Sequence, residues 1–307
     1  MPGAYAHLTI ANLLRNSVRL ENIDGFPLQA IPTVLRYGKY IELGSVSPDY
    51  PYLALSDVNA SVWADKMHYI QTGQMIHAGI KAIRLQPAEV QNKLLAWLLG
   101  YASHVIADVT IHPIIELKVG PYAQNKTAHR VCEMHQDVYI YRRMNLGDIG
   151  QAEFLDSGIG ACGNPHDHSR LDTDIKALWL SMLTDIYGDE VNTSPPDIDR
   201  WHQGFRFIVD NIAEEGGRLI PIARHVAAGL GLVYTKRPYS RYTHNLEVPN
   251  GSMDYDEVFD LALDNVARVW AVVAAGILEN DESYLTEIGN WNLDTGLDAS
   301  GNLVFWS

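Results

Sequence analysis

Residues 100–113 read Gly100-Tyr-Ala-Ser-His-Val-Ile-Ala-Asp-Val-Thr-Ile-His-Pro113. His104, Asp108 and His112 therefore follow one another at intervals of four residues. Each four-residue step turns an α-helix by about 40°, which spreads the three side chains over roughly 80° of one helical face. The residues between them are largely apolar, and an unpaired polar group buried among such residues costs about 1–3 kcal/mol. A metal ion shared by the three side chains removes that cost.

A second pair of ligand-type side chains follows in His129-Arg-Val-Cys-Glu133, where His129 and Glu133 also share a helical face. A single histidine on an amphipathic helix is usually a core or surface residue satisfied by hydrogen bonds. A His/Asp/His triplet on one apolar face is a different case. Because imidazole nitrogens mixed with carboxylate oxygens suit zinc better than calcium or magnesium, the pattern predicts a zinc site.

The rest of the chain predicts a mainly α fold. Apolar residues recur at helical spacing along most of its length, with Gly, Pro and Asn clusters between the periodic segments. The clearest helix begins at Pro87 and is expected to stop near His112, because Pro113 disfavours a helical conformation in the residue before it. Further helices are expected at residues 4–18, 60–83, 126–144, 170–187, 197–215, 218–230 and 253–280.

Three stretches are expected to be loops, namely residues 21–52, 145–169 and 232–252, since they are rich in Pro, Gly, Asn, Asp or aromatic residues. Residues 290–307 alternate polar and apolar side chains around Asp-Ala-Ser-Gly-Asn, which suggests a β-hairpin. We therefore expect one multi-helix domain over residues 1–282, with a loop insertion at about 145–169. A C-terminal hairpin tail over residues 283–307 is expected to pack on this domain.

Composition limits the partners and the location of the protein. The 307 residues carry 23 Lys and Arg against 37 Asp and Glu, and 23 − 37 gives a formal net charge of −14. That acidity argues against a stable complex with a nucleic-acid backbone. The two cysteines, Cys132 and Cys162, are too few for a disulfide framework. The chain as given shows no signal peptide or membrane-spanning run, which predicts a cytoplasmic protein or one that is processed or non-classically secreted.

The ligand-type residues resemble the zinc-dependent phospholipase C superfamily of helical phosphodiesterases, whose fold is shared by single-strand-specific zinc nucleases. The family pattern is a His that opens the first helix, an Asp in a loop, a His on the next helix, then His-x3-Asp-x3/5-His and finally His-x3-Glu. Over about residues 5–145, this chain offers the same order in His7, Asp49, His68, His104, Asp108, His112, His129 and Glu133.

The resemblance also implies how the metals are held. One zinc ion would be bound by Asp49, His68, His104 and Asp108. A second, with an open position for water, would be bound by His112, His129 and Glu133. A third would rest on His7 and the bridging Asp108, but three-zinc phospholipases complete that site with an N-terminal Trp, and residue 1 here is Met. Two zinc ions are therefore expected, and the third stays open.

Two carboxylates have further expected roles. In this family an Asp in the position of Asp49 is the favoured general base, because its second oxygen is free to accept a proton from the attacking water. Asp137 shares the helical face of His129 and Glu133, and is expected to orient an imidazole.

One segment, Tyr234-Thr-Lys-Arg-Pro-Tyr-Ser-Arg-Tyr-Thr-His244, is both basic and aromatic in an otherwise acidic chain. A solvated loop is the ordinary interpretation of such a segment. Cations and tyrosines beside a zinc cluster could also hold a phosphate, a choline-like head group or a membrane surface. The candidate substrate-binding residues are Tyr234, Lys236, Arg237 and Arg241. By contrast, His166 and His168 lie in a Gly/Asn/Pro-rich loop and are expected to be solvated.

The function expected from these features is zinc-dependent, phospholipase C-type cleavage of a glycerophospholipid by metal-activated water. The substrate would be a phospholipid or a small phosphodiester, and peripheral membrane contact is compatible with either. One alternative is a zinc nuclease of the same fold, which resembles His-x3-Asp rather than His-x3-Glu at the last ligand pair. The other is a helical binding module with structural zinc, against which Asp49 argues, because a closed structural site has no use for an additional base.

Overall fold

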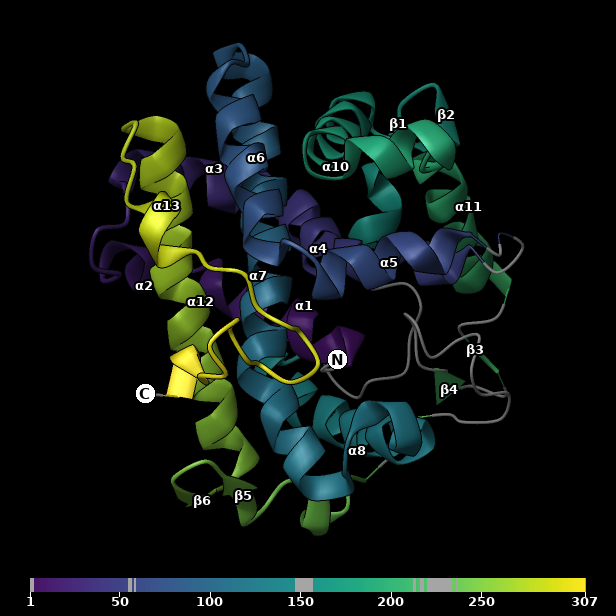
Figure 1. Cartoon of the computed structure of the whole chain (residues 1–307), viewed down its shortest axis with the longest axis vertical. Helices are drawn as coiled ribbons and strands as arrows, with labels where there is room; N and C mark the ends of the chain where they lie inside the picture. The colour runs from purple at the N-terminus through teal and green to yellow at the C-terminus, as the bar shows by residue number, and fades with distance from the viewer. Residues whose placement is uncertain are drawn as a thin grey trace.

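Helix α7 (Ala88–Val119) runs through the centre of the protein, and helices from both halves of the chain pack around it (Figure 1). Every residue of α7 from Leu94 to Ile115 is buried, as expected of a core helix. The computed structural model describes residues 3–54, 57, 59–146, 157–211, 214–215, 218–219, 234–235 and 237–306.

The predicted mainly α fold is confirmed. The other α-helices are α1 (Ala4–Leu14), α2 (Ser17–Glu21), α3 (Ile31–Arg36), α4 (Gly38–Val46), α5 (Ala60–Tyr69), α6 (Thr72–Arg84), α8 (Tyr122–Tyr141), α10 (Thr173–Thr193), α11 (Ile198–Asn211), α12 (Tyr255–Leu278) and α13 (Tyr284–Glu287). Short 3₁₀ helices are η1 (Leu28–Ala30), η2 (Ser47–Leu53), η3 (Arg142–Met144), η4 (Ile159–Cys162), η5 (Ser240–Tyr242) and η6 (Val304–Trp306). The strands pair as antiparallel ribbons of β1 (Gly163–Asn164) with β2 (Asp167–Leu171), β3 (Glu214–Glu215) with β4 (Arg218–Leu219), and β5 (Leu246–Val248) with β6 (Gly251–Met253).

Several predicted boundaries were wrong. The helix expected over 60–83 divides into α5 and α6 at Gln71, whose φ of +53° interrupts the helix. Of the helix expected over 218–230, residues 218–219 form β4 and the others lie outside the described residues. The described parts of the loops expected over 145–169 and 232–252 contain η4, η5 and four of the short strands.

The predicted end of α7 at Pro113 was also wrong, because the helix continues through the proline. Proline has no N–H to donate to Val109 O, and its ring crowds the preceding turn. The C-terminal tail covers this defect. Gly296, with φ at +71°, comes so close that a Cβ there would lie 2.5 Å from Val109 O. Trp306 Nε1 donates a hydrogen bond to Thr110 O at 2.9 Å.

The loop expected over 21–52 contains α3 and α4, and α4 crosses α7 with backbone against backbone. A Cβ at Gly44 would lie 2.1 Å from Trp97 O, and a Cβ at Gly100 would lie 2.1 Å from Ile41 O. Residues 40–51 are all buried. The segment therefore lacks the amphipathic pattern by which a surface helix is recognised. This crossing carries the following η2, with Asp49, into the interior.

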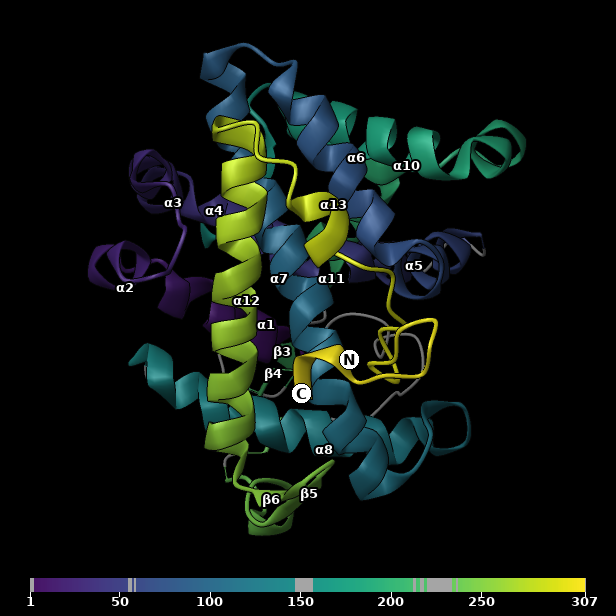
Figure 2. The ribbon, with the colours of Figure 1, turned by 60° about the vertical axis from the view of Figure 1, so that its left-hand side comes forward.

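The C-terminal tail is less regular than the expected hairpin. It makes one isolated antiparallel bridge, between Trp291 and Asp298, and ends in η6. Part of its backbone hydrogen bonding is directed to the helices instead of to a partner strand, as in the bond from Leu293 N to His68 O at 3.0 Å. Figure 2 shows the tail, in yellow, beside the lower half of α7.

Helices α7 and α12 are each long and apolar enough, by length and composition, to cross a membrane. The most apolar 18-residue window of α7 is 100% buried inside the protein, and that of α12 is 67% buried. The two helices pack along each other, with a hydrogen bond from Trp270 Nε1 to Leu99 O at 2.8 Å (Figure 2). Burial in the protein core accounts for the apolar composition of α7.

Candidate metal centre

The first group of predicted ligands, here called the first cluster, is drawn from four separate segments. His7 lies on α1, Asp49 in η2 and His68 at the end of α5, while α7 contributes His104 and Asp108. All five side chains are buried. The ligand atoms of His7, His104 and Asp108 lie within 4.8 Å of one another, as do those of Asp49, His68 and His104. The fold thus gathers residues that are up to 101 positions apart in the sequence, as 108 − 7 gives.

Asp108 is the centre of this cluster. Its Oδ1 lies 3.2 Å from His7 Nε2, while its Oδ2 lies 3.4 Å from His104 Nε2 and 3.8 Å from His68 Nε2. On the other side, His68 Nε2 lies 3.4 Å from Asp49 Oδ1. A carboxylate whose two oxygens face different imidazoles has the geometry needed to bridge two metal ions.

Backbone carbonyls orient two of the imidazoles. His68 Nδ1 donates to Ala64 O at 2.7 Å, and His104 Nδ1 donates to Ser45 O at 2.9 Å, because a carbonyl oxygen can only accept. In the neutral rings both Nε2 atoms therefore carry lone pairs, and these two atoms lie 3.4 Å apart. Such a pair repels unless positive charge lies between them. Orientation of ligating imidazoles by carbonyl groups is typical of metal sites.

The charges of the cluster also favour a cation. Burial raises the pKa of Asp108, but the neighbouring imidazoles of His104 and His7 outweigh it and hold this pKa far below its ordinary value. Burial likewise raises the pKa of Asp49, and His68 and His104 lower it further than burial raises it. Burial lowers the pKa of His104, yet the two carboxylates raise it overall. Two ionised carboxylates without water around them thus attract positive charge.

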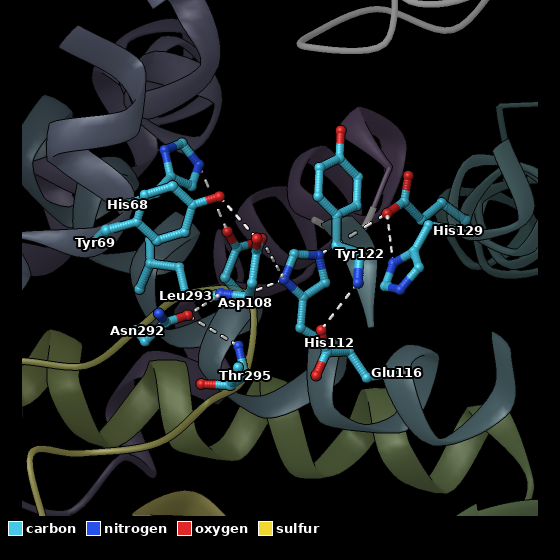
Figure 3. Close-up of polar contacts among 12 residues, drawn as sticks. His68, Tyr69, Asp108, His112, Glu116, Tyr122, His129, Asn292, Leu293 and Thr295 are labelled. Carbon is cyan, nitrogen blue, oxygen red and sulfur yellow. Dashed lines mark hydrogen bonds and ion pairs between the residues drawn. The ribbon is translucent and has the colours of Figure 1, made fainter. Parts of the chain in front are cut away.

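The second cluster consists of His112 on α7 with His129 and Glu133 on α8. His112 Nε2 lies 3.9 Å and His129 Nδ1 lies 4.0 Å from Glu133 Oε1. The remaining ring nitrogens donate to backbone carbonyls, His112 Nδ1 to Leu293 O at 2.6 Å and His129 Nε2 to Gly120 O at 2.7 Å. Figure 3 shows His112 and His129 on either side of this cluster. Gly120 takes φ +88° at the turn between α7 and α8, a conformation that favours glycine.

Several buried atoms of both clusters lack a partner with hydrogen-bond geometry among the residues that the structure describes. They are both ring nitrogens of His7, Asp49 Oδ1, both oxygens of Asp108, His112 Nε2 and His129 Nδ1. Left so, each would cost about 1–3 kcal/mol. Imidazole nitrogens and carboxylate oxygens are the usual protein ligands of zinc, so these residues fit zinc ions in both clusters.

Asp137 was predicted to orient an imidazole, but its hydrogen bonds go to other groups. Its Oδ1 accepts a hydrogen bond from Ala6 N at 2.8 Å and its Oδ2 accepts one from Tyr234 Oη at 2.6 Å. Burial raises the pKa of Asp137 to about 7. Asp137 shares a face of α8 with the candidate ligands, but the segment that it contacts is the first turn of α1. It therefore holds the helix that carries His7.

The predicted substrate-binding residues differ in their exposure. Tyr234 is buried, and its hydroxyl donates a hydrogen bond to Asp137, so it is not accessible to a substrate. Arg241 is exposed, with its guanidinium 4.6 Å from the ring centroid of Tyr242. Arg237 is exposed as well, and Lys236 lies outside the described residues. Within the part of the chain described, the contacts of Arg237 and Arg241 are with Thr235, Tyr239 and Tyr242, and not with either cluster.

Sequence reasoning missed a cation beside the second cluster. Arg130 follows His129 on α8 and is buried, and its Nε has no hydrogen-bond partner among the described residues. Burial lowers the pKa of Arg130, while Tyr234 and Glu133 act in the opposite direction. Its spacing from Glu133 and Asp137, at i+3 and i+7, places it on their helical face and was the available signal.

The comparison with protein families agrees with this geometry. The family described as zinc dependent phospholipase C matches residues 6–189, which is more than half of the chain and includes both clusters. The protein is therefore mainly helical, with His and Asp groups that could hold metal ions. It belongs to the zinc-dependent phospholipase C family. No curated protein and no solved structure matches the chain.

Proposed function

We propose that the protein is a zinc-dependent phosphodiesterase that cleaves a glycerophospholipid at the phospholipase C bond. The observation that carries the proposal is the inward orientation of unpaired ligand atoms in both clusters, with the opposite nitrogens of four histidines held by backbone carbonyls. This arrangement leaves lone pairs, and not N–H groups, facing each cluster centre.

The two clusters would hold the ions in different ways. The first would bind zinc through Asp49, His68, His104 and Asp108. The second would bind zinc through His112, His129 and Glu133. Zinc bound there would polarise a phosphodiester and make an attacking water more acidic. A third ion would rest on His7 and Asp108, whose Nε2 and Oδ1 atoms are 3.2 Å apart. Neither ring nitrogen of His7 has a hydrogen-bond partner within the described part of the chain.

Asp49 is the residue we propose as general base. It is buried, and the neighbouring His68 and His104 keep its carboxyl ionised, so it can accept a proton. Pro48 and Pro51 flank it in η2 and restrict the backbone on both sides. A base held in this way keeps its orientation toward the reacting water.

Arg130 would contact the substrate. A buried guanidinium with an unpaired Nε next to the second cluster is suited to a phosphate oxygen, which would supply the missing acceptor. The net charge of −14 disfavours a long polyanion and is compatible with a single phosphodiester group. A phospholipid or another small phosphodiester therefore fits better than a nucleic acid.

Two measurements test the proposal. Elemental analysis of protein purified without chelator should find at least two zinc ions per chain, and less than one would overturn the metal assignment. The zinc-loaded protein should then be compared on phosphatidylcholine vesicles, p-nitrophenyl phosphocholine and single-stranded DNA. Faster cleavage of DNA than of either choline substrate would identify a nuclease. Full zinc content without turnover of any phosphodiester would indicate a structural role.

A further inference from the structure

A short turn of the C-terminal tail, Asn292–Thr295, contacts both clusters (Figure 3). Leu293 N donates a hydrogen bond to His68 O at 3.0 Å. Leu293 O accepts one from His112 Nδ1 at 2.6 Å. One buried residue thus binds the end of α5, which carries a ligand of the first cluster, and the imidazole of a ligand in the second cluster. This turn lies outside residues 6–189, which match the family.

The side chain of Asn292 builds the turn. Its Oδ1 accepts hydrogen bonds from Asp294 N at 3.0 Å and from Thr295 N at 3.1 Å. These bonds close the backbone around Leu293 and aim its carbonyl at His112. The turn can therefore be opened by a change at Asn292 that touches neither metal ligand.

Asp294 adds a second attachment at the same place. Its Oδ2 accepts a hydrogen bond at 2.7 Å from the hydroxyl of Tyr69, the residue that follows His68 in the chain. Its Oδ1 lies 3.7 Å from His112 Nδ1. A carboxylate close to this nitrogen favours the neutral tautomer with its proton on Nδ1, which leaves the lone pair on Nε2, the atom that faces Glu133.

We propose that the Asn292–Thr295 turn is a positioning element of the metal centre, and that it sets the orientation and tautomer of His112. This inference rests on the zinc sites proposed above. The ring of His68 keeps its own bond to Ala64 O within α5, so loss of the turn should spare the first cluster. The ring of His112 donates its hydrogen bond to the carbonyl of Leu293. Loss of the turn should therefore lower the affinity of the second cluster for its ion.

The test is zinc release from the full-length, zinc-loaded protein into a chromogenic chelator. In Asn292→Ala, one of two ions should leave about 10–100-fold faster than in the wild type, the usual effect of removing a group that orients a ligand. Asn292→Asp keeps an acceptor oxygen and should restore release to near the wild-type rate. A matched control is Asp298→Ala, since Asp298 Oδ1 closes a similar turn on Ser300 N and Asn302 N farther along the tail.

A second variant keeps the inference testable if Asn292→Ala does not fold, as judged by circular dichroism. Asp294→Asn retains an oxygen for Tyr69 but loses the charge near His112, and should speed release of the same ion by about two- to fivefold. Equal release from the Asn292, Asp294 and Asp298 variants and the wild type would overturn the role of the turn. A wild-type protein without zinc would instead overturn the proposed function itself.

Discussion

The two clusters differ in how far apart their ligand atoms lie. Two atoms bound to one tetrahedral zinc at about 2.0–2.1 Å are separated by about 3.3 Å. In the first cluster the closest pairs are 3.2 and 3.4 Å apart, whereas in the second the pairs with Glu133 are 3.9 and 4.0 Å apart. The first cluster thus has the ligand spacing of a tetrahedral zinc site, and the second would have to contract or keep wider angles to bind one ion.

The cause lies in how the ligands are supported. The first cluster is drawn from α1, η2, α5 and α7, and the backbones of α4 and α7 are in contact at Gly44 and Gly100. The second cluster uses only α7 and α8, and α8 is kinked at Asn125, shortly before His129. A wider and less constrained site is better suited to exchange a water or substrate oxygen. We therefore expect the first cluster to contribute more to stability, and the second to exchange its water or substrate oxygen more readily.

The largest expected effect is that of Asp49→Asn on turnover. Asn keeps the size and one oxygen donor but cannot accept a proton, so kcat should fall by about 10²–10⁴-fold. Zinc content should stay near that of the wild type, as measured by elemental analysis of the same preparation. A variant that keeps more than about a tenth of the wild-type rate would remove Asp49 from the role of base.

A direct comparison of the clusters uses Asp108→Asn and Glu133→Gln. Removing the charge of Asp108 leaves three imidazoles around an incomplete site and should lower the free energy of unfolding by about 3–5 kcal/mol. Glu133→Gln should lower it by only about 1–2 kcal/mol, since the second cluster is less constrained. Denaturant unfolding in zinc-containing buffer measures both. Equal losses would show that the difference in spacing has no energetic consequence.

The loss of folding stability in acid has a contribution from a buried histidine, His202, that lies outside both clusters. His202 accepts or donates a hydrogen bond with Tyr50 Oη through Nδ1 at 2.9 Å, and burial lowers its pKa to about 4. A depressed histidine pKa means that the folded state excludes the proton, so its contribution is present above pH 6.5 and is lost as the pH falls toward 4. The loss is about 3 kcal/mol.

His202→Gln should therefore reduce the loss of stability between pH 6.5 and 4, measured as free energy of unfolding at each pH. Because zinc also leaves its histidine ligands in acid, the same series in Glu133→Gln serves as the control for the metal contribution. An identical pH slope in His202→Gln and the wild type would assign acid unfolding to the clusters alone.

The smallest expected effect is that of Arg130→Met on substrate binding. This change keeps much of the side-chain length but removes the guanidinium, and should raise KM for a small phosphodiester about tenfold with little change in kcat. Stability should stay the same or increase, because the variant removes a buried charged group whose Nε lacks a hydrogen-bond partner among the described residues. Lower stability with an unchanged KM would make Arg130 a structural residue.

The candidate ligands on α7 were predictable because their spacing is local. Four-residue intervals at His104, Asp108 and His112 place side chains on one face of any α-helix, whatever surrounds it. The prediction at Pro113 failed for the opposite reason. Whether a proline ends a helix depends on whether the freed carbonyls find other neighbours, and here Gly296 and Trp306 arrive from the far end of the chain.

The sequence by itself determined the mainly α class, the ligand types and their order, since each follows from periodicity and residue chemistry over short distances. Only the tertiary structure decided which atoms meet. Helices α4 and α7 cross at Gly44 and Gly100, just before η2 brings in Asp49. The turn around Leu293 directs a carbonyl at His112. These contacts join residues separated by 56 and 181 positions, as 100 − 44 and 293 − 112 give. No local pattern encodes such pairs, because they depend on close packing of the whole chain.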